Sequence, residues 1–168
     1  MSDDSDTQRG TPRFPAKIQT MLSAGRLKEQ RASDANIAAV WQKAVESAAD
    51  AELTDMSIDG SLRAAYDAGH MAALALLAAH GLRPARGQGH HEMAFAGAAA
   101  LGNPALDDLV PDSEEIRGLR SGSMYDPVIA DAADQLSALE WMRRVLPPMQ
   151  SAIVAANPAL RGRLAKYP

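Results

Sequence analysis

The chain has 168 residues, of which 46% are hydrophobic but only 4% aromatic, so its core has to be built mainly from alanine and aliphatic side chains. It contains no cysteine, which excludes disulfides, thiolate metal sites and thiol nucleophiles. The formal charge of -4 gives no general attraction to nucleic acid, so any RNA contact has to come from a local basic patch. Because no apolar run reaches the roughly 18 residues of a membrane span and the first residues are acidic and polar, we expect a cytoplasmic protein that does not bind membranes.

The spacing of apolar residues predicts an all-α fold, an antiparallel helical bundle of about five main helices. We expect the bundle to occupy residues 16–160. Residues 1–15 combine Asp, Ser, Gly and Pro with almost nothing to bury and are predicted to be a disordered tail, and residues 161–168 a C-terminal tail.

Helical spacing and capping residues indicate where each helix lies, and no segment alternates as a strand would. The expected helices cover residues 16–25, Ser33 to Ala48, Leu62 to His80, 90–101, Asp112 or Ser113 to Arg120, and 127–156. The helix that ends at His80 is apolar nearly all round, so it should be the central one, and Gly81 should end it in a left-handed conformation. Pro147-Pro148 are expected to bend the last helix.

A basic, glycine-containing loop at residues 83–89 (RPARGQG) precedes a helix whose first residues are His90 and His91. Backbone N–H groups at a helix start, the helix dipole and nearby guanidinium groups all favour a phosphate or another anion. The alternative is a simple turn, in which the arginines are solvated and the histidines cap or pack. The candidates for phosphate or nucleic-acid binding are Arg83, Arg86, Gly87 and Gly89.

The other histidines are weaker candidates. His70 can share a helix face with Tyr66 and Asp67, which would orient it as a base, but a core histidine with one hydrogen bond is the simpler interpretation. We expect a structural role for His80 in the last turn of its helix. A zinc site built from His80 and the pair at the next helix start lacks a fixed ligand spacing, so no metal and no cofactor are expected.

The alanine-rich central helix, the GLRPARGQGHH stretch and the segment from Arg120 to Tyr125 together resemble HEPN domains, small bacterial helical bundles of toxin–antitoxin and defence systems, over about residues 17–157. The resemblance implies a homodimer with a metal-independent ribonuclease site, in which His and Arg of both protomers face each other across a cleft. By position, Arg120 matches the arginine of the family and Tyr125 stands where the family has histidine. A phenol with a pKa of about 10 is ionised to only about 0.1% at pH 7, so Tyr125 is no ordinary general base. We therefore expect a degenerate or atypical site in which His90 or His91 is recruited from the loop.

Two classes of function follow from these residues. The first is binding of, or action on, RNA or a nucleotide, with Arg120, Tyr125, His90 and His91 as candidate catalytic residues. The second is a non-catalytic interaction module that docks a partner protein, for which the resemblance suggests a nucleotidyltransferase or a cognate antitoxin. A small-molecule site in the bundle core is disfavoured, because the many alanines close the space between helices.

Overall fold

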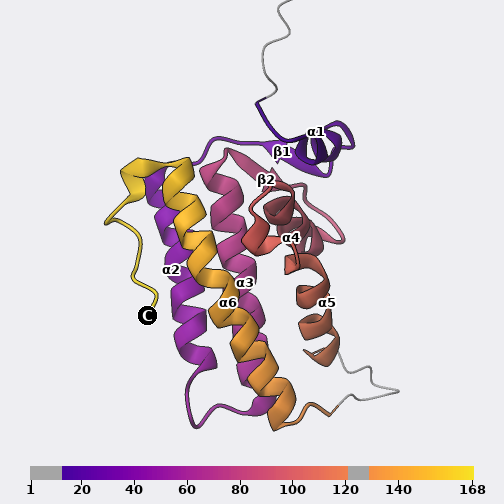
Figure 1. The fold of residues 1–168 in the computed structure, drawn as a ribbon, viewed down its shortest axis with the longest axis vertical. Helices are drawn as coiled ribbons and strands as arrows, with labels where there is room; N and C mark the ends of the chain where they lie inside the picture. Colours follow the sequence, from indigo (N-terminus) through magenta and orange to yellow (C-terminus); the bar gives the residue numbers. More distant parts are fainter. Residues whose placement is uncertain (1–12, 121–128) are drawn as a thin grey trace, which may run out of the picture.

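The computed structural model describes residues 13–120 and 129–168, and this part of the chain is a bundle of α-helices (Figure 1). Its long helices α2 (Asp34–Ala51), α3 (Ile58–Ala79) and α6 (Ala132–Ala156) lie side by side. α2 runs antiparallel to both others, and its start meets the end of α6, where Asn157 Nδ2 donates a hydrogen bond to Asp34 Oδ1 at 2.7 Å. The predicted all-α bundle is therefore confirmed.

Shorter elements cover one side and one end of the long helices (Figure 1). α4 (His90–Ala100) and α5 (Leu109–Arg120) pack beside α3, and α1 (Ala16–Ser23) lies at the end where α3 finishes. Single 3-10 turns at Pro104–Leu106 (η1) and Pro158–Leu160 (η2) complete the described elements. None of the described helices is long and apolar enough to cross a membrane.

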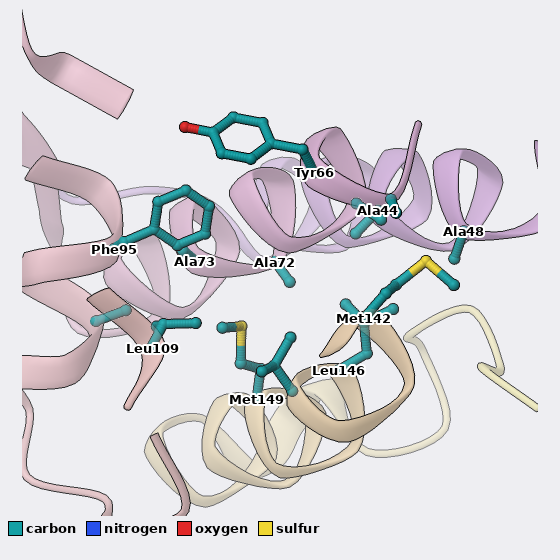
Figure 2. Packing of buried hydrophobic residues seen from close by; sticks show 14 of the residues in the cluster. Ala44, Ala48, Tyr66, Ala72, Ala73, Phe95, Leu109, Met142, Leu146 and Met149 are labelled. Carbon is teal, nitrogen blue, oxygen red and sulfur yellow. The ribbon is translucent and has the colours of Figure 1, made fainter. Parts of the chain in front are cut away.

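α3 is the central helix, as its all-round apolar sequence predicts, and it contacts α2, α4, α5 and α6. Ser57 caps it by accepting a hydrogen bond from the Gly60 N–H at 3.1 Å. Five of its alanines are fully buried and let neighbouring helices approach closely: Ala65, Ala68, Ala72, Ala73 and Ala75. Figure 2 shows Met142, Leu146 and Met149 of α6 facing Ala72 across the core. Few large side chains are therefore needed to fill this core.

The expectation that no segment forms a strand was wrong. β1 (Leu27–Glu29) and β2 (Leu82–Pro84) pair in antiparallel register, with Leu27 opposite Pro84 and Glu29 opposite Leu82. Each strand has only three residues, too few for an alternating pattern to stand out. The pair matters for the site because β2 fixes the direction in which the chain enters the loop before α4.

Three helix starts also differ from prediction. α3 begins at Ile58 rather than at Leu62, because Ser57 caps it. α5 begins at Leu109 rather than at Asp112 or Ser113, because Pro111 falls in the first turn, where a backbone N–H has no helical partner to lose. α6 begins at Ala132 rather than at 127, because Asp131 accepts hydrogen bonds from the N–H groups of the first turn and forms a capping box. α6 then continues as one helix through Pro147 and Pro148.

Both ends of the described chain contact the bundle. Of the residues predicted to form an N-terminal tail, 1–12 lie outside the described residues and Phe14 is buried. The C-terminal residues 161–168 run beside α2, where the indole N–H of Trp41 donates to the carbonyl of Ala165 at 2.8 Å (Figure 1). Tyr167 packs against the same core.

Candidate functional site

Imidazole rings from two helices converge where α3 and α4 meet. The ring of His70 from α3 stacks on that of His91 with centroids 4.0 Å apart and planes 14° apart. His90 lies 4.3 Å from His91 and 6.3 Å from His70, centroid to centroid. His70 is buried, His91 half-buried and His90 exposed. We call these three residues the histidine cluster; it forms a continuous path from the core to the surface.

Glycines in the preceding loop put the two α4 histidines in place. Gly89 is the N-cap of α4 with φ of 79°, and Gly87 has φ of 131°, conformations that other residues rarely adopt. The turn brings the carbonyl of Gly87 to 3.1 Å from Nδ1 of His90. Since no side chain caps α4, its first turn keeps the positive end of the helix dipole facing this loop.

The cluster borders a hollow of about 500 Å³ that also includes Tyr66, Glu92 and Arg117. Arg117 Nη1 lies 2.5 Å from Glu92 Oε1, so α5 contributes a guanidinium group directly beside the α4 histidines. Arg117 was not among the predicted site residues. Its spacing from Arg120 could have indicated it, because residues three positions apart are neighbours on a helix.

A second, basic hollow of about 340 Å³ also reaches His90. The basic hollow includes three of the four residues predicted to bind phosphate, Arg83, Arg86 and Gly87, and none of its described lining residues is acidic. The fourth, Gly89, lines the hollow that includes Arg117. Arg83 is held in place by hydrogen bonds to the Gln30 side chain and to the Pro84 carbonyl.

A third hollow, of about 560 Å³, runs from the histidine cluster across α3 to α2. Its described lining contains one basic residue, Lys43, and three acidic residues, Glu46, Asp50 and Asp67. We call it the acidic groove. This groove was not predicted from the sequence. Glu46 and Asp50 share one face of α2 by their spacing, but Asp67 and the histidine cluster come from other helices, and only helix packing brings them together.

The other predicted site residues are not part of the described cluster. Arg120 is the last residue of α5, and Tyr125 lies outside the described residues, so their convergence with the histidine pair stays a prediction. His80 is the C-cap of α3, as expected, and lines a separate hollow with Arg13 and Arg31. Burial lowers the pKa of His80, which favours the neutral ring there. Within the described residues, no group of three or more His, Asp or Glu side chains could hold a metal ion.

No family model, no curated protein and no solved structure matches this chain. What the site can do therefore depends on its own side chains. Two imidazoles 4.3 Å apart can act as a general acid and a general base on one substrate. The arginines and the start of α4 can stabilise a negatively charged group beside these two rings.

Proposed function

We propose that this chain is an HEPN-like protein that binds RNA or a nucleotide at the histidine cluster, with an atypical, metal-independent ribonuclease site. The observation that carries the proposal is the pair His90 and His91, whose rings lie 4.3 Å apart at a glycine-capped helix start. A phosphate there would meet the helix dipole and the guanidinium groups of Arg83 and Arg86 on one side and of Arg117 on the other.

The reaction that such a pair could perform is cleavage of an RNA phosphodiester by its own ribose. One neutral imidazole takes the proton of the 2'-hydroxyl while the 2'-oxygen forms a bond to phosphorus. The bond from phosphorus to the 5'-oxygen breaks, and the other ring, in its protonated form, gives that oxygen a proton. The products are a 2',3'-cyclic phosphate and a free 5'-hydroxyl, and the histidine pair ends with the same number of protons.

His70 has a different role in this scheme. It is only 4% exposed and offers a substrate little surface, but its stacked contact with His91 fixes the plane of that ring. The buried ring of Phe95 lies 5.9 Å from that of His70 between centroids, so the core supports the stack. We therefore regard His70 as a positioning residue.

The resemblance adds three expectations to this proposal: a homodimer, a contribution of Arg120 and Tyr125 across the dimer cleft, and a cytoplasmic toxin–antitoxin or defence setting. The helical bundle is compatible with them. The site on one protomer already has an acid–base pair, so RNA binding does not depend on Tyr125 in this proposal.

The test is binding and cleavage of a short single-stranded RNA in the presence of EDTA. We expect the wild type to bind the RNA in fluorescence anisotropy and a His90→Ala/His91→Ala variant to bind at least tenfold more weakly, with unchanged circular dichroism. His80→Ala is the matched control, because His80 lies outside the cluster, and it should bind as the wild type does. A new 2',3'-cyclic phosphate end would show cleavage, whereas intact bound RNA would show binding alone. Equal affinity of the double variant and the wild type would refute the proposal.

A second candidate function is the non-catalytic interaction module. It is favoured by large hydrophobic side chains that are exposed near the end of α2 and the start of α6, which lie at the same end of the bundle (Figure 1). Leu53 is 49% and Leu136 52% exposed. A contiguous apolar patch at this end of the bundle would be typical of a protein-binding surface. If they join two copies or a partner, Leu53→Ser/Leu136→Ser should abolish the complex in sedimentation velocity without changing RNA binding.

A further inference from the structure

The acidic groove has the surfaces that a nucleobase needs. Met71 and Leu74 of α3 are half-buried and provide apolar surface, and Glu46, Ser47 and Asp50 of α2 provide hydrogen-bonding groups. At one end of the groove stands the exposed ring of His90, which also lines the basic hollow. Flat aromatic bases bind proteins by stacking on such rings and by hydrogen bonds at their edges.

The carboxylates of the groove disfavour a phosphate and select the edge of the base. Apart from the histidine cluster, the described lining has three carboxylates and one lysine, so it disfavours an anion. Carboxylates accept hydrogen bonds from exocyclic amino groups, such as N4 of cytosine, and are repelled by carbonyl oxygens. The two hollows that share His90 therefore have opposite preferences, with phosphate favoured beside Arg83 and Arg86 and an amino-bearing group favoured beside Glu46 and Asp50.

We infer that the acidic groove is the base-binding half of the site and takes a nucleobase with an exocyclic amino group, while the attached phosphate lies on the basic side of His90. This inference rests on the proposed function. Glu46 and Asp50 are then the residues that determine specificity. They are exposed on α2, one turn apart, and so lie on one face of that helix.

Cytosine and uracil provide the sharpest comparison, because they have the same ring size and differ at position 4, where cytosine has an amino group and uracil a carbonyl oxygen. A hydrogen bond to a charged acceptor changes affinity by about tenfold or more. We therefore expect an RNA hexamer of cytidines to bind about tenfold more tightly than a hexamer of uridines. In a Glu46→Gln/Asp50→Asn variant this ratio should approach one, and the uridine hexamer should bind no more weakly than to the wild type, because repulsion is removed.

The experiment measures both hexamers by anisotropy with the wild type, the Glu46→Gln/Asp50→Asn variant and Glu140→Gln. Glu140 is the matched control, an exposed carboxylate on α6 that lines none of these hollows, and its variant should keep the wild-type ratio. If neither hexamer binds to the wild type, the proposed function fails and this inference fails with it. If both bind with equal affinity, or uridine is preferred, only the inference is refuted. Spermine tests for a cation site instead. If spermine binds to the wild type without displacing either hexamer, and the Glu46→Gln/Asp50→Asn variant no longer binds it, the groove is a cation site and the inference is refuted.

Discussion

Replacing Gly69 by alanine tests how closely α3 and α6 pack. A Cβ atom built on Gly69 would lie 2.3 Å from Cη2 and 2.9 Å from Cζ3 of Trp141. Carbon atoms in good contact are about 3.5–4.0 Å apart, so either the indole or a helix has to move. The indole is confined: Trp141 is 3% exposed, and its ring packs edge-on against Phe95 at 6.0 Å between centroids. The position therefore requires glycine for space and not for backbone conformation.

Two opposing effects set the change in the free energy of unfolding for Gly69→Ala. Overpacking a core costs about 1–3 kcal/mol, and alanine recovers up to about 1 kcal/mol because it is the better helix former. The overlap with a ring held by its neighbours places the cost at the upper end of that range. We therefore expect Gly69→Ala to lower the free energy of unfolding by about 1–2 kcal/mol, and the larger Gly69→Leu to lower it further.

Urea denaturation followed by tryptophan fluorescence measures this change. Gly118→Ala is the matched control, because a Cβ at this helical position meets nothing within 4 Å, and it should raise stability by about 0.5–1 kcal/mol. Trp141→Phe, which removes the outer part of the ring, should make the Gly69→Ala cost disappear in a double-mutant cycle. Stability gains of equal size for Gly69→Ala and Gly118→Ala would show that the indole does not occupy this space.

Further predictions concern pH and the C-terminal residues. Because burial lowers the pKa of His80 below its ordinary value of 6.5, the unfolded chain binds this proton more readily than the folded one, and stability should fall as the pH drops below about 6.5. The melting temperature of His80→Asn should therefore fall less between pH 7.5 and 5.5 than that of the wild type; parallel falls would contradict the assignment. Deleting residues 164–168 removes the Ala165 carbonyl that accepts from Trp41 and should cost about 1 kcal/mol or more at pH 7.5. An unchanged urea midpoint would mean that this segment contributes nothing to stability.

Local sequence signals predicted the fold where one residue determines a local conformation. Ser33 accepts a hydrogen bond from the Asn36 N–H at 3.2 Å and caps α2, and Gly81 ends α3 with φ of 71°. A local signal failed at α5, which was expected to begin after Pro111, although proline is tolerated in the first turn of a helix. The β strands are made by pairing between segments more than fifty residues apart, which no local pattern contains.

The residues of the candidate site also divide into those that local sequence marks and those that only helix packing brings together. His90 and His91 could be found because glycines and a helix start mark them in the sequence, but their partner His70 is 20 residues earlier on another helix. It looked like an ordinary core histidine, and it is indeed buried; its contact with His91 depends on which face of α3 turns toward α4. Arg117 and the carboxylates of α2 were missed for the same reason, since helix packing alone brings them to the histidine cluster.

The ion pair of Arg117 with Glu92 bears on the predicted role of Arg120. Glu92 directly follows His91, so this contact joins α5 to the first turn of α4. Arg120 is three positions later in α5, a rise of about 4.5 Å along the helix axis. Its backbone therefore lies one helical turn from a residue that lines the histidine hollow, as an anion site shared by both elements requires. Because Arg117 is ion-paired with Glu92, a phosphate beside His91 would share this guanidinium group with a carboxylate, and the contribution of Arg120 that the resemblance implies stays a prediction.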